Sequence, residues 1–208
     1  MKIIGLTGGI GSGKSFVAEI AEKNFPILNI NTDEIARTQM LYGGKSYYKV
    51  VEEFSGYSDK LLCENGEIDR KVLARIALSD EKLLKKLDEI THPAVIDEIL
   101  SIISFQKEKN DYCAVLIETA LLYEAGIDKI CDEVWYVYAP LGTRIKRLKE
   151  TRGYDEEKIE SFFKRQKPEE EFLGKADRTV PNGADVTASD MIKIISGYLS
   201  EKFEQSGE

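Results

Sequence analysis

An eight-residue segment near the start of the chain combines the residue types that bind phosphate groups. It reads GGIGSGKS from Gly8 to Ser15 and fits the pattern G-x-x-x-x-G-K-[ST] at every fixed position. The glycines allow a tight turn that aims backbone N–H groups at phosphate oxygens, and the start of a helix adds partial positive charge. Lys14 would reach the β- and γ-phosphates, while the Ser15 hydroxyl would coordinate Mg²⁺. The segment therefore predicts a site for a nucleoside triphosphate with Mg²⁺.

The residues on both sides of this segment predict the elements that must hold it. Residues 2–7 (KIIGLT) form an apolar run that enters the glycines as a buried strand would, and residues 15–23 are typical of a helix. The order of strand, glycine loop and helix is the context in which the pattern binds phosphate. The alternative, a glycine-rich turn beside a surface lysine, would not need that order.

Strands and helices alternate along the rest of the chain. Further strands are expected at residues 26–31, 112–117 and 133–138. Helices are expected at residues 33–40, over most of residues 47–107 with Ser79 as the N-cap of one of them, and at residues 189–203. This alternation indicates an α/β fold with a parallel sheet. The charged segment 143–175 has no strand signal, so a helical lid could be inserted there.

Composition argues against several classes of function. The chain has 208 residues with 42% apolar content, enough for one sizeable core, so one domain with at most a small insertion is expected. Its net charge of −8 argues against a nucleic acid partner, because nucleic acid phosphates favour a basic surface. No apolar run approaches the ~20 residues that span a bilayer, and residues 1–6 are too short for a signal peptide. No membrane association and a cytoplasmic location are therefore expected.

Cysteine and histidine are too sparse for other common sites. Cys63, Cys113 and Cys131 form no CxxC pair and are odd in number, which favours a reducing compartment. His92 is the only histidine, so a zinc site or a Ser-His-Asp triad is disfavoured. No N-K-x-D segment follows a later strand, which argues against a GTPase.

Asp33 is the candidate partner of the phosphate-binding segment. It follows the second expected strand, and in open parallel sheets the strand ends face the ligand crevice. Its carboxylate could accept the proton of an attacking hydroxyl, or it could instead cap the following helix. Arg37, one helical turn later, would project on the same side, where it could pair with Asp33 or bind an acceptor phosphate.

Several longer segments make the sequence resemble a known family. They are GLTGGIGSGKS at residues 5–15, NTDEIAR at 31–37, NGEIDRKVLARIALSDEKLLKKLDEITHP at 65–93, LLYEAGI at 121–127, RIKRLKETRGYDEEKI at 144–159, Gln166, and ADRTVPN at 176–182. In this order, and over nearly the whole chain, they are similar to the dephospho-coenzyme A kinase family. The combination of IDR, ITHP and a downstream LL-x-E is much more restrictive than the phosphate-binding pattern alone.

The resemblance implies a reaction, a fold and a division of the chain. The reaction is the last step of coenzyme A synthesis, ATP-dependent phosphorylation of the ribose 3′-hydroxyl of dephospho-CoA, with ATP, Mg²⁺ and dephospho-CoA as ligands. The fold is α/β, a three-layer P-loop kinase fold with a five-stranded parallel sheet. Within one domain, the core would comprise residues 1–36, 107–140 and 175–208, the helical acceptor-binding region residues 37–106, and the helical lid residues 141–174.

The matched positions also imply roles for individual residues. Lys14, Asp33 as general base and Arg147 would be catalytic. The nucleotide would contact Gly9, Gly11, Ser12, Gly13, Lys14, Ser15, Phe16, Arg144, Arg147 and Asn182. The acceptor would contact Asp33, Arg37, Arg70, His92 and Glu118. The alternatives are a solvated helix face for the lid arginines, a surface ion pair for Arg70, and a helix-cap role for His92 before Pro93.

Two positions depart from the family's pattern. The family commonly has an aspartate two residues before a proline ahead of LL-x-E, where this chain has Glu118 and Ala120. Glu118 could still orient a Mg²⁺-bound water or an acceptor group. Where the family tends to carry an arginine, four residues before the lid glutamine, this chain has Phe162. Arg165, beside Gln166, either substitutes for that arginine or the contact is missing.

Other functions are alternatives to this interpretation. A nucleoside kinase or another small-metabolite kinase of similar fold comes first. A nucleotide sensor that binds ATP without transfer comes next, although Asp33 and the lid arginines argue against it, since a sensor needs neither. The oligomeric state is open, with a monomer favoured.

Overall fold

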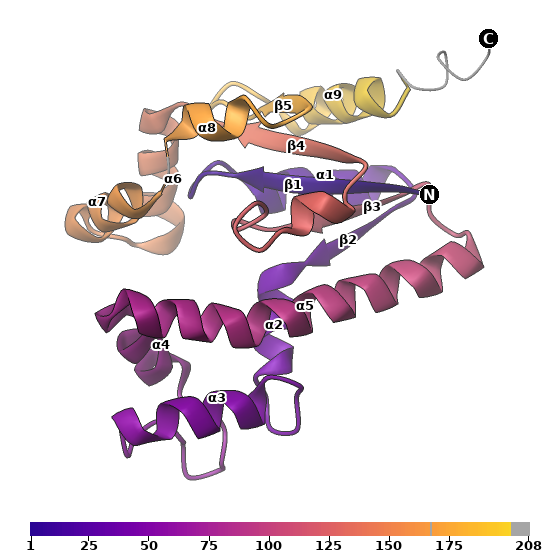
Figure 1. The fold of residues 1–208 in the computed structure, drawn as a ribbon. Coiled ribbons are helices and arrows are strands. Elements are labelled where there is room, and N and C mark those ends of the chain that lie inside the picture. Colours follow the sequence, from indigo (N-terminus) through magenta and orange to yellow (C-terminus); the bar gives the residue numbers. More distant parts are fainter. Residues whose placement is uncertain (167, 201–208) are drawn as a thin grey trace. The chain divides into compact units, whose positions relative to one another are not determined.

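The computed structural model describes residues 1–166 and 168–200, and these fall into two compact units (Figure 1). The first unit comprises residues 1–30 and the described residues from 110 onward. The second comprises residues 31–109. Among the helices of the described residues, none is both long and apolar enough to cross a membrane.

The first unit is built on a five-stranded sheet with the strand order β2-β3-β1-β4-β5 (Figure 1). The strands are β1 (Lys2–Gly8), β2 (Ile27–Asn31), β3 (Ala114–Glu118), β4 (Glu133–Tyr138) and β5 (Arg178–Pro181). β1 pairs in parallel with both β3 and β4, and β4 pairs in parallel with β5. The α/β fold with five parallel strands is confirmed, and the carboxyl ends of these strands meet at one edge, where such sheets bind ligands.

Two helices bury one face of this sheet. They are α1 (Lys14–Asn24), which follows β1, and α9 (Ala188–Ser200). Their buried residues join those of the strands in one apolar cluster: Ile4, Leu6, Val17, Ala18, Ala21, Ile27, Ala114, Leu116, Trp135, Val137, Val180, Met191 and Ile195. The predicted first and last helices are confirmed, although positions 201–203 of the last one lie outside the described residues.

The charged segment after β4 is helical, as predicted. It contains α6 (Leu141–Arg152), α7 (Glu156–Arg165) and α8 (Glu169–Leu173), which belong to the first unit. A short 3-10 helix, η2 (Ile127–Ile130), lies between β3 and β4.

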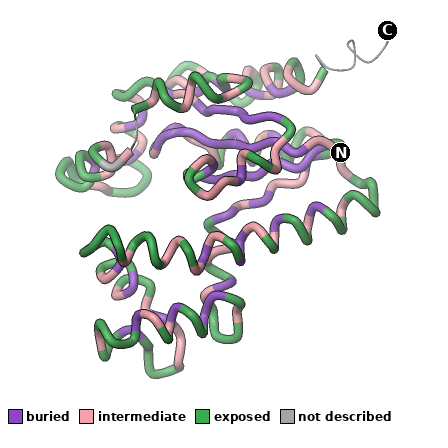
Figure 2. Tube along the Cα trace, in the orientation of Figure 1, coloured by how far each residue is buried: buried purple, intermediate pink, exposed green. Residues whose placement is uncertain are grey.

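The second unit is mostly helical, as the periodicity predicted, apart from an isolated antiparallel bridge between Leu62 and Ile68. It contains α2 (Thr32–Gln39), α3 (Tyr47–Phe54), the 3-10 helix η1 (Ser55–Tyr57), α4 (Arg70–Ser79) and α5 (Glu81–Lys109). Its core is the cluster Tyr47, Val50, Phe54, Leu61, Ile68 and Leu73, with Leu83, Leu87 and Ile90 of α5 packed against it. Buried and exposed residues alternate along α5, as expected for an amphipathic helix (Figure 2).

Two details of this unit differ from the sequence-based predictions. Ser79 is not the N-cap of α5 but the last residue of α4, where its hydroxyl donates to the carbonyl of Ile76 at 2.7 Å. Asp80 caps α5 instead, because its Oδ1 accepts from the backbone N–H of Lys82 at 2.8 Å. The helix also continues through Pro93 to Lys109, so no helix ends at His92.

A buried carboxylate on β4 links β1, the first strand along the chain, to β5, the last. Glu133, the first residue of β4, is 4% exposed and accepts hydrogen bonds from Lys2, Arg178 and, at 2.9 Å, the Trp135 indole. Three strands of the sheet are thereby tied at one point.

Replacing this carboxylate is expected to destabilise the first unit. Glu133→Gln would remove the negative charge that Lys2 and Arg178 both contact in a partly buried site, so the free energy of unfolding should fall by about 3–5 kcal/mol. Urea denaturation followed by circular dichroism measures this change. The matched control is Glu19→Gln, which breaks the exposed Lys23–Glu19 pair and should cost at most ~1 kcal/mol. Equal effects of the two changes would contradict the expectation.

Candidate active site

The phosphate-binding segment forms the loop between β1 and α1. Ser12 donates its backbone N–H to the carbonyl of Gly9 at 3.1 Å, which closes the turn. Gly13 precedes α1 in a left-handed conformation with φ of 90°, and a Cβ atom there would overlap Asn182 Nδ2. Only glycine satisfies both conditions. The loop therefore presents backbone N–H groups at a helix amino terminus, the arrangement that binds phosphates.

The side chain of Lys14 folds back onto this loop. Its ammonium donates to the carbonyl oxygens of Gly8 at 2.9 Å and Gly9 at 3.4 Å. The positive charge lies beside the loop, where it can reach the terminal phosphates of a bound nucleotide.

Ser15 pairs with a carboxylate from another strand. Its Oγ donates to Glu118 Oε1 at 2.5 Å, and Glu118 is only 6% exposed. Glu118 is the last residue of β3 and lies opposite Leu6 of β1, so the sheet register carries it to the loop. Glu118 stands where the family commonly has an aspartate. In the structure it contacts Ser15, the residue predicted to coordinate Mg²⁺.

Arg144 of α6 is buried against the first half of the loop. It is 6% exposed, its Nε donates to the carbonyl of Ile10 at 2.8 Å, and its Nη2 donates to Gln166 Oε1 at 2.8 Å. The guanidinium also lies 4.8 Å from the centre of the Phe163 ring. A side chain on Gly9 would overlap this guanidinium, so that glycine allows the close approach. The solvated-face alternative for Arg144 is wrong.

Arg147 of the same helix contacts the second half of the loop. Its Nη1 donates to the carbonyl of Ser12 at 3.1 Å and its Nη2 to that of Gly183 at 3.2 Å. Asn182 is 1% exposed and also donates to the Ser12 carbonyl, at 2.7 Å. Both lid arginines therefore contact the loop from the helix face that their three-residue spacing predicted they would share. Phe16, the third residue of α1, is 37% exposed.

A cavity of about 270 Å³ opens beside the start of this loop. Its lining combines apolar and polar side chains from the strand ends, the segment after β3, and α6 to α8. The lining residues are Thr7, Gly8, Gly9, Ala120, Leu121, Glu124, Tyr136, Arg144, Gln166, Glu169 and Phe172. All of them belong to the first unit.

Tyr136 and Glu169 form a hydrogen-bonded pair at the wall of this cavity. The Tyr136 hydroxyl donates to Glu169 Oε1 at 2.9 Å, and the same oxygen lies 3.6 Å from Arg144 Nη1. Burial raises the pKa of Tyr136, and the hydrogen bond to Glu169 raises it further. The phenol therefore stays protonated at neutral pH and keeps donating to Glu169.

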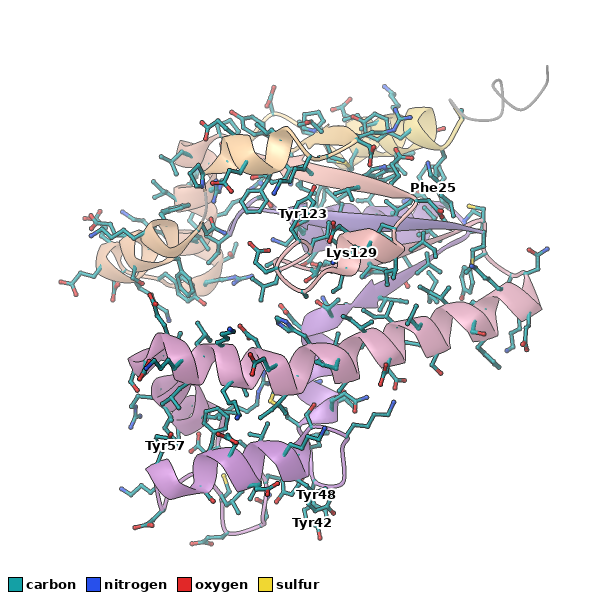
Figure 3. All side chains as sticks on the ribbon, viewed as in Figure 1. Phe25, Tyr42, Tyr48, Tyr57, Tyr123 and Lys129 are labelled. Atoms are coloured by element: carbon teal, nitrogen blue, oxygen red, sulfur yellow. The ribbon has the colours of Figure 1, made fainter. Side chains whose placement is uncertain are left out.

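A second tyrosine lies close to Phe172 at the wall of the cavity. Tyr123, labelled in Figure 3, lies in the segment between β3 and η2, 6.0 Å from the Phe172 ring. Burial and nearby carboxylates raise the pKa of Tyr123 to about 12, so this phenol is also neutral.

Asp33 is the second residue of α2 in the second unit. The N-cap of that helix is Asn31, whose Oδ1 accepts from the backbone N–H of Glu34 at 3.1 Å. The N-cap alternative for Asp33 is therefore wrong, and its exposed carboxylate is not required by the helix end. Arg37 pairs with Glu34 at 3.7 Å, whereas pairing with Asp33 was one of the two alternatives for it.

The other two acceptor candidates also lie on helices of the second unit. Arg70 is the exposed first residue of α4, which Asp69 caps. His92 lies within α5, where its Nε2 is 3.6 Å from Asp88 Oδ1 one turn earlier. The helix-cap alternative for His92 is wrong because the helix has no end there.

Some residues that contact the site were assigned no role from the sequence. Gln166 belongs to the family resemblance, but its contacts with Arg144 and the backbone N–H of Ile10 were not foreseen. Glu169 gave no signal, since its partners Tyr136 and Arg144 are distant in sequence. The side chain of Arg165, proposed as a substitute for the missing family arginine, lies outside what the structure describes.

Comparison with known proteins agrees with this arrangement. A family model described as dephospho-CoA kinase matches residues 2–188. The dephospho-CoA kinase of Moorella thermoacetica is 37% identical over 189 residues, covering 91% of this chain and 87% of the relative. The solved dephospho-CoA kinase from Campylobacter jejuni aligns with a TM-score of 0.70 at 26% identity, over 98% of each chain. A crystal structure from Thermus thermophilus gives a TM-score of 0.78 at 29% identity, over 97% of each chain. The chain belongs to the dephospho-CoA kinase family.

Proposed function

We propose that this chain transfers the γ-phosphoryl group of ATP to the ribose 3′-hydroxyl of dephospho-CoA, giving coenzyme A and ADP. The observation that carries this proposal is the assembly of Lys14, the Ser15–Glu118 pair and two lid arginines around one loop in a member of this family. The free thiols of all three cysteines suit a reducing compartment, and we extend the proposal to the cytoplasm.

The loop and Lys14 would bind and neutralise the triphosphate. Phosphoryl transfer needs mainly positioning and charge stabilisation, because negative charge spreads over the oxygens of the transferring group. Backbone N–H groups between Gly9 and Ser15 would fix the β- and γ-phosphates, and the Lys14 ammonium would offset charge as the bond to the leaving group breaks.

Ser15 and Glu118 fit a Mg²⁺ site. They supply a hydroxyl and a carboxylate, the oxygen ligands that this ion prefers. Among the described residues, no group of three or more acidic, histidine or cysteine side chains is suited to a metal. When bound, Mg²⁺ would supply positive charge that offsets the negative charge of the triphosphate. Glu118 would keep the Ser15 hydroxyl oriented toward that position.

Asp33 and the lid arginines would complete the reaction. Asp33 would accept the proton of the attacking 3′-hydroxyl as general base. Arg147 would stabilise the charge on the transferring group, and Arg144 would assist from the other half of the loop. The acceptor-binding region at residues 37–106, with Arg37, Arg70 and His92, and the lid at residues 141–174 are parts of the same proposal.

Glu118→Gln tests the proposed metal site. The amide keeps the size of the side chain but loses its charge, so the Mg²⁺ concentration for half-maximal rate should rise about 10- to 100-fold. The measurement is a Mg²⁺ titration of turnover at saturating ATP and dephospho-CoA. Glu150→Gln is the matched control, because this carboxylate of α6 is exposed and pairs with Lys146. An unchanged Mg²⁺ dependence in Glu118→Gln would remove that residue from the site.

The function itself is tested by the choice of acceptor. ATP consumption is measured with dephospho-CoA, adenosine, a nucleoside monophosphate or water, and the product is analysed by mass spectrometry. We expect turnover with dephospho-CoA and a product heavier by one phosphoryl group at the 3′-position. Turnover with adenosine alone would reassign the chain to a nucleoside kinase, and tight ATP binding without transfer would make it a sensor.

A further inference from the structure

The two halves of the phosphate-binding loop have different neighbours within the first unit. At the carbonyl of Ser12 lie Arg147 and Asn182, and the family resemblance implies that Asn182 borders the adenine of ATP. At Gly9 and Ile10 lie Arg144 and Gln166. The cavity borders only this second side, because its lining includes Gly8 and Gly9 but neither Ser12 nor Asn182. It is therefore separate from the side expected to hold the nucleoside of ATP.

The size and lining of the cavity suit a flat ring with its sugar. Its volume of about 270 Å³ is just below the ~300–1,000 Å³ of sites that hold whole drug-sized ligands, so it would hold a part of a large acceptor. Phe172 and Tyr136 both line it, with ring centres 6.0 Å apart and planes inclined by only 15°. Leu121 and Ala120 add apolar surface, while Thr7 and Gln166 add hydrogen-bonding groups.

We propose that this cavity binds the adenine base and ribose of the acceptor, dephospho-CoA, with Phe172 as the principal contact of the base. This inference rests on the proposed function. The attacking 3′-hydroxyl must lie within about 3–3.5 Å of the γ-phosphorus, beside the loop. The base is joined to the same ribose, so it must occupy space next to the loop, and the cavity at Gly8 and Gly9 is that space. The first unit would thus contribute to recognition of the acceptor.

The pair of Tyr136 and Glu169 keeps this wall in place. Glu169 begins α8, which carries Phe172, and its carboxylate accepts from Tyr136 of β4 at 2.9 Å. Tyr136 also stacks on Phe172, so one strand residue holds both ends of α8. The Phe172 ring is thereby fixed by the sheet before the acceptor arrives, which lowers the entropy lost on binding.

The experiment compares dephospho-CoA with an analogue that lacks the base, in the wild-type enzyme and in Phe172→Ala. Stacking of a base on an aromatic side chain accounts for about 5- to 100-fold in affinity. Wild type should therefore show a KM for dephospho-CoA lower than that for the abasic analogue by about this factor. Phe172→Ala should raise the KM for dephospho-CoA by a similar factor, leave the KM for ATP unchanged, and abolish the discrimination between the two acceptors.

Two further variants separate binding from folding. Phe172→Leu keeps an apolar side chain on α8 but loses the aromatic face, and it should reproduce the loss of discrimination with an unchanged melting temperature. Phe162→Ala is the matched control, since Phe162 of α7 stacks on Tyr154 at 5.7 Å and does not line the cavity. It should retain the wild-type KM values for both acceptors.

The outcomes that overturn the inference differ from those that overturn the proposed function. If wild type phosphorylates dephospho-CoA but Phe172→Leu raises the KM for ATP, the cavity holds the donor instead. If Phe172→Leu raises the KM for dephospho-CoA and for the abasic analogue equally, the cavity holds another part of the acceptor. Failure of the wild type to phosphorylate dephospho-CoA would instead contradict the proposed function.

Discussion

Lys14→Ala is expected to lower kcat by about 100- to 1,000-fold with dephospho-CoA as acceptor. The ammonium lies beside the loop carbonyls of Gly8 and Gly9, and its contribution grows as charge develops on the transferring group. The loss should therefore appear mainly in kcat, with a smaller change in the KM for ATP. Steady-state kinetics at saturating Mg²⁺ measure both constants.

A second lysine of the same helix provides the control for this change. Lys23 lies at the end of α1, where it pairs with Glu19 in an exposed contact. Lys23→Ala removes an equal charge from α1 but should leave kcat and both KM values unchanged. If Lys14→Ala changed only the KM for ATP, Lys14 would bind the ground state and the transition state equally, against the proposal.

Asp33→Asn is the second large effect, with an expected fall in kcat of about 100- to 10,000-fold. The amide has nearly the same shape but cannot accept the proton of the 3′-hydroxyl. Because Asn31 already caps α2, the helix should keep its stability, so the loss can be assigned to chemistry. Turnover, the KM for each substrate and thermal unfolding are measured on the same preparation.

The neighbouring carboxylate gives a close comparison. Glu34 shares the first turn of α2, is exposed, and pairs with Arg37 at 3.7 Å. Glu34→Gln removes the same charge one residue away and should retain at least half of the wild-type kcat. Full activity of Asp33→Asn with unchanged affinities would mean that another group accepts the proton.

Local patterns were sufficient for the loop itself, for the first four strands and for the general placement of the helices, but not for β5. The apolar run at β1, the glycines of the loop and the periodicity of α1 are adjacent in sequence, so their local preferences agree with one another. The same holds for β4, whose predicted bounds match the observed Glu133–Tyr138. Helix ends were predicted less well, because Ser79 and Asp80 both favour an N-cap, and the side chain of Asp80 makes the hydrogen bond.

Side-chain partners distant in sequence could not be predicted in this way. Glu118 looked like an uncertain substitute for an aspartate, yet the register of β3 beside β1 brings it to Ser15. A helix-cap role was one alternative for His92, because proline disfavours helix in the preceding residue, yet α5 continues through Pro93. In both cases packing outside the local segment outweighed the local preference.

The residues alone predicted the nucleotide-binding loop and the alternation of strands and helices. Through the family's motifs they also predicted the reaction. These features depend on contiguous residues, whose conformations are set by glycine, by hydrophobic periodicity and by the start of a helix. Only the folded chain decided that Glu118 meets Ser15, that Arg144 and Arg147 contact different halves of the loop, and that Phe172 and Tyr136 enclose a cavity. Those contacts join segments far apart in the chain, and their geometry follows from strand register and side-chain packing, which no short stretch of sequence contains.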